Sequence, residues 1–151
     1  MVSRDDAAGF TIIELVVVIG IATILSAFAI SRINVASFDT EGIANRAAAM
    51  VRYAQKLAIA QRRTVFVVTT VGPPSNIKLC YADATCATPV HEPPGTNSFT
   101  YDAPSGVSLS ATSFSFSALG KPSAGTTITV TGDGTKTITI AAETGYVQYV
   151  P

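Results

Sequence analysis

Residues 9–30 have the sequence GFTIIELVVVIGIATILSAFAI, in which one carboxylate, Glu14, lies inside an otherwise apolar run. The 22 residues from Phe10 to Ser31 would form an α-helix about 33 Å long, which matches a bilayer core of about 30 Å. A carboxylate near the centre of a membrane-spanning helix costs roughly 2.5–3.5 kcal/mol, and less toward an edge. The stretch therefore predicts a transmembrane helix in which Glu14 needs a compensating partner.

Two alternatives to a membrane anchor are a secretory signal peptide and a buried helix of a soluble domain. A signal peptide has a shorter apolar region, more positive charge before it and a small-x-small cleavage site, which SAFA at 26–29 could imitate. The first nine residues, MVSRDDAAG, contain one Arg and two Asp, which is atypical of a signal peptide. A buried soluble helix would leave Glu14 unexplained.

The N-terminal stretch resembles the class III signal of type IV pilins and type II secretion pseudopilins. The resemblance rests on Gly9, on Phe10 after it, on Glu14 five residues into the mature chain, and on the apolar helix. It implies cleavage between Gly9 and Phe10 by prepilin peptidase, followed by N-methylation of Phe10. It also implies a single pass through the bacterial inner membrane with a periplasmic head, and later entry into a pilus or pseudopilus filament with other pilin subunits.

The same resemblance gives Glu14 a role in assembly. Cleavage would create a positive α-amine at Phe10, one helical turn from Glu14 on the same face. Two unit charges about 4 Å apart attract by roughly 4 kcal/mol at an effective dielectric constant near 20, which is comparable with the burial cost. The resemblance implies that Glu14 meets the amine of a neighbouring subunit. Pairing with its own amine, or a tolerated carboxylate at the edge of an anchor, are the alternatives.

Residues 32–63 are predicted to form an amphipathic helix that continues into the head. Apolar side chains recur at intervals of three and four residues between Ile43 and Ala58, the period of one helix face. Thr40 is a candidate N-cap of this second half of the helix. Gly42 and the stretch NVASFDTEG that ends with it predict a bend or break between the transmembrane half and the amphipathic half. The helix is expected to end near Arg63.

Five basic side chains lie largely off this apolar stripe and offer a possible nucleic-acid or partner surface: Arg46, Arg52, Lys56, Arg62 and Arg63. A DNA- or ligand-binding pilin of a DNA-uptake apparatus is therefore the alternative function. Stacking platforms for bases require aromatic residues between the charges, and only Tyr53 provides one in this segment. A solvated helix face, or one that meets neighbouring subunits, is the simpler interpretation.

Residues 64–151 are predicted to form a β-rich head, because short β-prone runs alternate with Gly, Pro and Asn. The clearest signal is TITVTGDGTKTITIA at 127–141, where an Asp-Gly turn separates two alternating runs and predicts an antiparallel hairpin. Phe114 and Phe116 are predicted core residues. The expected fold class is α+β: a long N-terminal helix, with a transmembrane and an amphipathic half, packed against antiparallel β-sheet. The expected organisation is a leader at 1–9, a filament-core helix at 10–31, an amphipathic helix at 32–63 and the head at 64–151.

The two cysteines, Cys80 and Cys86, have five residues between them. A disulfide here would close a small loop and stabilise the fold by about 2–2.5 kcal/mol in a chain-entropy estimate. Two free thiols are the alternative, but an N-terminal membrane segment favours an oxidising compartment. The spacing does not suit a zinc site, which needs CxxC-like spacing and further ligands.

Composition and motifs predict a structural subunit rather than an enzyme. The 151 residues are 48% apolar and 13% charged with zero formal net charge, so no global charge favours nucleic acid. His91 has only Glu92 beside it, and no arrangement of catalytic, metal-binding or cofactor-binding residues is recognised. The order FSFSALGKP, a Thr/Ile hairpin and ETGYV is similar to H-type minor pseudopilins (GspH/FimT-like). This resemblance implies a minor pilin or pseudopilin with a tip or assembly-priming role.

Overall fold

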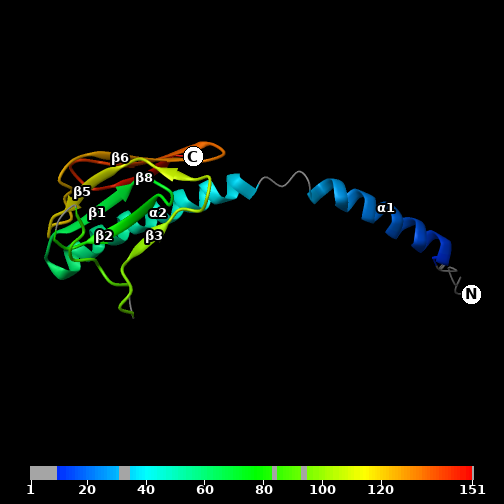
Figure 1. The fold of residues 1–151 in the computed structure, drawn as a ribbon, viewed down its shortest axis with the longest axis horizontal. Coiled ribbons are helices and arrows are strands. Elements are labelled where there is room, and N and C mark those ends of the chain that lie inside the picture. Colours follow the sequence, from blue (N-terminus) through cyan, green and yellow to red (C-terminus); the bar gives the residue numbers. More distant parts are fainter. Residues whose placement is uncertain (1–9, 31–34, 83–84, 93–94, 151) are drawn as a thin grey trace, which may run out of the picture. The chain divides into compact units, whose positions relative to one another are not determined.

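The computed structural model describes residues 10–30, 35–82, 85–92 and 95–150 (Figure 1). The chain divides into two compact units, Met1–Asn34 and Val35–Pro151; the second is called the head below. The predicted leader, with Gly9, lies outside the described residues, as does Ser31 at the end of the predicted transmembrane segment.

The first unit contains helix α1, Ile12–Ile30. Its sequence is apolar all round and has no preferred face, as expected for a helix that is surrounded by apolar material rather than packed on one side. In the described part of the chain, no helix is long and apolar enough to cross a membrane.

The head begins with helix α2, Val35–Gln61, which ends two residues before the expected Arg63. The predicted break at Gly42 and the predicted cap at Thr40 are wrong, because α2 runs through both residues. A helical glycine costs only about 1 kcal/mol, and the burial of Thr40 and Ile43 offsets this cost. The Thr40 hydroxyl accepts a hydrogen bond from the Asp133 N–H at 3.3 Å, so it joins α2 to the sheet instead of capping the helix.

In the described residues that follow α2, eight strands form two four-stranded antiparallel sheets. The first sheet has the order β3-β2-β1-β5, with β1 Val65–Thr70, β2 Asn76–Cys80, β3 Thr100–Asp102 and β5 Thr112–Phe116. The second has the order β4-β6-β7-β8, with β4 Ser108–Leu109, β6 Thr126–Thr131, β7 Thr135–Ile140 and β8 Val147–Val150. Figure 1 shows α2 lying along both sheets, and α2 contacts strands of each.

The hairpin predicted from alternation is β6–β7. Ile128 is paired with Ile138 across it, and Val130 is paired with Lys136. Since the side-chain period of a strand is two, Ile128, Val130 and Ile138 all point to one face, and each is fully buried. The alternation therefore predicted the hairpin and its apolar face, and the observed pairing agrees with both.

The hydrophobic core of the head is made of one face of α2 and the facing sides of both sheets. Phe114 and Phe116 are buried as predicted, and their rings meet edge to face with centroids 5.5 Å apart. All members of this core cluster lie between Ile43 and Val147. The head thus has a core of its own and is expected to fold without the first unit.

Candidate functional site

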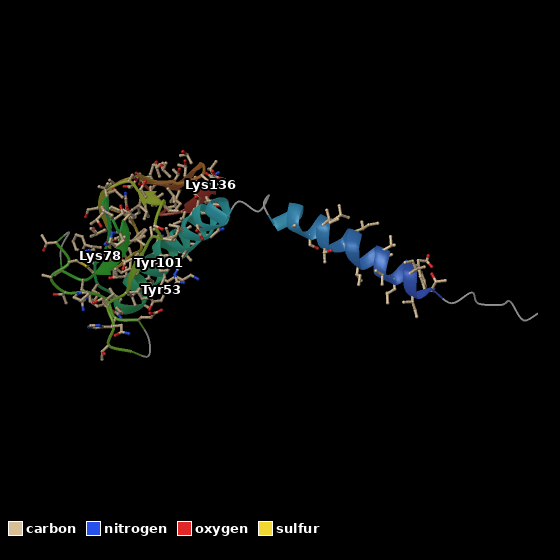
Figure 2. All side chains as sticks on the ribbon, turned by 45° about the vertical axis from the view of Figure 1, so that its right-hand side comes forward. Tyr53, Lys78, Tyr101 and Lys136 are labelled. Atoms are coloured by element: carbon tan, nitrogen blue, oxygen red, sulfur yellow. A yellow bond between two sulfur atoms is a disulfide. The ribbon has the colours of Figure 1, made fainter. Side chains whose placement is uncertain are left out.

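The surface of α1 is the first candidate site, because its large apolar side chains are exposed wherever the structure describes them. Those between Ile12 and Leu25 are 51% to 84% exposed, and Figure 2 shows them projecting from opposite sides of the helix. An apolar surface of this extent in water is unfavourable at roughly 25 cal/mol per Å² and normally marks a region covered by lipid or by another protein.

The first turn of α1 is capped by Thr11. Its hydroxyl accepts a hydrogen bond from the Glu14 N–H at 3.3 Å, and its carbonyl accepts one from the Leu15 N–H at 3.1 Å. Thr11 and Glu14 have the T-x-x-E spacing of a capping box. The sequence contains this signal, but the prediction from sequence missed it. A carboxylate in the first turn also complements the positive end of the helix dipole, so Glu14 helps to begin α1.

Apart from Glu14, the polar side chains of α1 are satisfied within the helix. The Thr23 hydroxyl donates to the carbonyls of Gly20 at 2.8 Å and Ile19 at 3.0 Å. The Ser26 hydroxyl donates to the Ala22 carbonyl at 2.7 Å. Among the described residues, no hydrogen bond or ion pair reaches the Glu14 carboxylate. The helix therefore suits an apolar environment except at one charge near its start.

The basic face of α2 is the second candidate site, and the structure changes its interpretation. The sequence offered only Tyr53 between the charges, but the sheet brings further aromatic rings against them. The Arg46 guanidinium lies 4.1 Å from the centroid of the Tyr101 ring, and Arg63 lies 3.9 Å from that of Tyr81. Tyr53 stacks on Phe99 with centroids 5.0 Å apart. Figure 2 shows Tyr53 and Tyr101 on the same side of the head.

These contacts occupy the groups that nucleic acid would need. Arg52 donates to the Val147 carbonyl at 3.2 Å and so ties α2 to β8. Of the five basic residues, only Lys56 and Arg62 make no such contact among the described residues. Since most of the charged groups and ring faces are used to hold the sheets and loops on α2, the DNA-binding alternative is not favoured.

A charged cluster lies at the opposite end of α2. Glu41 pairs with Lys136 at 3.3 Å. The Tyr149 hydroxyl, and then Lys136, hold the pKa of Glu41 below its usual value. Burial, together with the Glu41 carboxylate, raises the pKa of Tyr149 to about 12. The Glu41–Lys136 ion pair joins the first half of α2 to β7.

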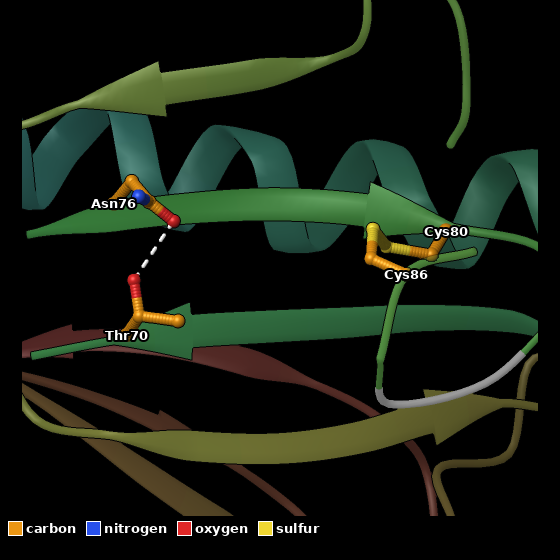
Figure 3. The surroundings of a disulfide bond; sticks show 4 residues. All are labelled: Thr70, Asn76, Cys80 and Cys86. Atoms are coloured by element: carbon orange, nitrogen blue, oxygen red, sulfur yellow. Dashed lines mark hydrogen bonds between the residues drawn. A yellow bond between two sulfur atoms is a disulfide. The ribbon is translucent and has the colours of Figure 1, made fainter. Parts of the chain in front are cut away.

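Cys80 and Cys86 form the predicted disulfide, and no cysteine is free. Cys80 is fully buried at the end of β2. At the other end of the β1–β2 pair, the Thr70 hydroxyl donates to the Asn76 side-chain oxygen at 2.9 Å (Figure 3). The disulfide therefore links the segment that follows β2, which contains Cys86, to the end of that strand.

The N-terminal segment and the fold can both be compared with known proteins. Residues 4–30 match the family model of the prokaryotic N-terminal methylation motif. The structure resembles the type IV minor pilin FimU of Pseudomonas aeruginosa, with a TM-score of 0.60 and 18% sequence identity over 76% of this chain and 90% of that one. The chain carries a methylation motif and has the pilin fold. The predicted resemblance and the α+β fold class are confirmed at this level.

Two further solved structures share the fold of this pilin-like chain. A second crystal form of FimU gives a TM-score of 0.57 at 18% identity, over 74% of this chain and 92% of that chain. The minor pseudopilin EpsH from the Type 2 Secretion System of Vibrio cholerae gives 0.55 at 13% identity, over 76% and 95% of the two chains. A search of the curated proteins found no match for the sequence.

Proposed function

We propose that this chain is a minor pilin or pseudopilin, a structural subunit that enters a filament through its N-terminal helix. The observation that carries the proposal is α1, which is apolar on all sides, satisfies its own hydroxyl groups and has near its start the Glu14 carboxylate, which pairs with no other described residue. This helix lies within the methylation motif at residues 4–30 and belongs to a chain with the pilin fold. A helix with this surface needs apolar neighbours on every side, which a membrane or a bundle of like helices provides.

In this proposal prepilin peptidase cleaves the chain between Gly9 and Phe10 and methylates the new amine of Phe10. Residues 10–31 anchor the subunit in the inner membrane with the head in the periplasm. On assembly, Glu14 pairs with the α-amine of a neighbouring subunit, which relieves the cost of a carboxylate in an apolar environment. The head then lies on the outside of the filament and contacts other heads. No catalytic step is required of any residue.

The first test is the intact mass of the protein from membranes of a host with prepilin peptidase. A mass that begins at Phe10 and includes one methyl group is expected, whereas a host without the peptidase should yield the chain with its leader. Gly9→Val should prevent cleavage, while Ala8→Val, the matched control one residue away, should not. A mature mass that retains Met1, or that begins after Ala29, would contradict the proposal and indicate a signal anchor or a secreted domain.

A further inference from the structure

Two surface turns lie side by side at the end of the head where α2 ends. In residues 117–121 the N–H of the fourth residue donates to the carbonyl of the first at 2.8 Å. In residues 141–146, which connect β7 to β8, the N–H of the fifth residue donates to the carbonyl of the first at 2.9 Å. Both turns are therefore closed by their own backbone hydrogen bonds.

Side chains hold the two turns against each other and against α2. The Gln55 side-chain nitrogen donates to the Gly120 carbonyl of the first turn at 2.9 Å and to the Thr144 carbonyl of the second at 3.0 Å. An ion pair between Lys121 and Glu143 joins the turns at 2.7 Å. A surface that is fixed in this way before it binds loses little conformational entropy on binding.

The turns approach each other closely because each has a glycine at the contact. The φ angles of Gly120 and Gly145 are 79° and 67°, in the left-handed region that favours glycine. A Cβ atom at Gly145 would lie 2.9 Å from the Gly120 carbonyl oxygen, and one at Gly120 would lie against the Ile59 side chain. Larger residues at these two positions would push the turns apart.

This end of the head carries most of its exposed large apolar or aromatic side chains. Leu119 at the tip of the first turn is 90% exposed, Tyr146 at the end of the second turn is 67% exposed, and Ile59 of α2 is 49% exposed. These three residues are called the distal patch below. In the rest of the described head, the exposed side chains of this kind are Val71 and Val150. Apolar side chains that a rigid support gathers in water mark a surface that binds something apolar.

Basic side chains border the distal patch. Lys56 lies one helical turn before Ile59 on the same side of α2. Arg62 follows, and its N–H donates to the Ile59 carbonyl at 3.3 Å. Both basic residues are exposed, and neither forms an ion pair with a described residue. The Glu143 carboxylate beside the patch is neutralised by Lys121. The rim of the distal patch is therefore positive.

The shape and chemistry of the distal patch suit a lipid surface better than a protein. A specific protein interface buries about 800 Å² on each partner and needs a complementary surface, whereas a few projecting side chains enter a fluid headgroup layer without one. An apolar tip, a tyrosine with an apolar ring and a polar hydroxyl, and flanking cations are the combination that binds membrane interfaces. The positive rim is complementary to the phosphate groups of anionic lipids.

We infer that the distal patch inserts into the headgroup layer of an anionic lipid bilayer, with Leu119 at the deepest point and Lys56 and Arg62 on lipid phosphates. Val35, where the head begins, and Ile59 are 24 residues apart in α2, which is about 36 Å. The patch thus lies at the end of the head remote from its junction with the first unit. The inference goes beyond the proposed function: it gives a head at the tip of a filament a surface that meets a membrane.

Flotation of the head, residues 35–151, with lipid vesicles tests this inference without α1, whose apolar surface would itself bind lipid. The core of the head lies wholly within these residues, and urea unfolding of the same samples checks that they are folded. Vesicles of phosphatidylglycerol and phosphatidylcholine in equal parts should bind the head at least tenfold more tightly than phosphatidylcholine alone. Added salt should weaken this binding, since it screens the charges. A folded head that binds neither vesicle, or both equally, would overturn the inference.

Two pairs of variants separate insertion from simple adsorption. Leu119→Ser should weaken binding about tenfold, whereas Val71→Ser, its matched control, should not, because Val71 is an exposed apolar residue about 20 Å along β1 from the end of α2. Lys56→Gln should weaken binding about fivefold, and Lys78→Gln, on the face of β2 opposite the core, should not. Equal binding by the two apolar variants would overturn the inference, even if Lys56→Gln bound more weakly.

The full chain gives an independent readout. Both native cysteines are in the disulfide, so Leu119→Cys provides a single thiol for a polarity-sensitive dye. The labelled chain is held in phosphatidylcholine nanodiscs, and vesicles that contain phosphatidylglycerol are added. A blue shift of the dye is expected, and none is expected with Val71→Cys. No shift, or equal shifts at the two positions, would overturn the inference. The intact mass of the same sample shows separately whether the chain begins at Phe10, so a processed chain without the shift refutes only the membrane contact.

Discussion

Gln55 connects two loops at one end of the head, and its replacement by glutamate tests how that end is held together. Its side-chain nitrogen donates to the Gly120 carbonyl at 2.9 Å and to the Thr144 carbonyl at 3.0 Å. Gln55→Glu keeps the size of the side chain but removes both N–H donors. At neutral pH it also places a carboxylate against two carbonyl oxygens.

The expected loss follows from the two hydrogen bonds. Each contributes about 0.5–1.5 kcal/mol, so their loss lowers the free energy of unfolding by about 1–3 kcal/mol. The variant should therefore lose about 2–3 kcal/mol at pH 7, where repulsion between the carboxylate and the carbonyl oxygens adds to the lost hydrogen bonds.

The pH dependence of this loss has a definite sign. A protonated carboxyl can donate one hydrogen bond, so the fold favours the protonated form and raises the pKa of the introduced group above its unfolded value of about 4.3. The deficit is then smallest below that unfolded value and grows as the pH rises through the folded pKa.

Urea unfolding of the head, residues 35–151, at pH 7 and pH 3.5 measures both effects. Gln148→Glu is the matched control, because Gln148 is exposed on β8 and the substitution introduces the same charge. Comparing the variants at each pH cancels the contributions of the other carboxylates. The reasoning is refuted if both variants lose the same free energy at pH 7, or if the Gln55→Glu deficit is larger at pH 3.5.

Three further results are expected. Phe116→Ala should lower the free energy of unfolding of the head by about 3–5 kcal/mol in the same assay, because Phe116 is fully buried in the core. A loss below about 1 kcal/mol would mean that the core is not packed as described. Lys121→Met should raise the pKa of Glu143 toward its ordinary value, measured by NMR titration, because the ion pair with Lys121 lowers it. The Lys121–Glu143 pair therefore stabilises the fold at pH values above the pKa of Glu143 in the unfolded chain. This stabilisation is lost as the pH falls through the pKa of Glu143 in the folded protein. An unchanged titration curve of Glu143 in the variant would show that the pair does not form in solution. Glu14→Leu should leave membrane retention intact but reduce the assembled fraction at least tenfold, the equivalent of about 1.4 kcal/mol. The control Thr23→Val should assemble normally, because among the described residues the Thr23 hydroxyl bonds to its own helix. Equal assembly of the two variants would show that Glu14 has no role in the assembly step.

Local sequence patterns determined several features of this protein. An apolar run with no periodicity gives α1, and strict alternation on both sides of an Asp-Gly turn gives the β6–β7 hairpin with its apolar face. The match to the prokaryotic N-terminal methylation motif at residues 4–30 likewise comes from the sequence alone. The close spacing of Cys80 and Cys86 suits their disulfide. The Thr11 cap, with the T-x-x-E spacing of a capping box, was also present in the sequence, although it was not recognised there. These features are local, because they depend on residues that are close together in the chain.

Features that depend on distant residues were decided only by the tertiary structure. Propensity alone predicted a break at Gly42, but burial of Thr40 and Ile43 against the sheet extends α2 through it. Arg46 seemed free for a partner until β3, more than fifty residues later, brought the Tyr101 ring against it. The physical reason is the same in each case: the free energy comes from contacts between segments that only the complete fold brings together.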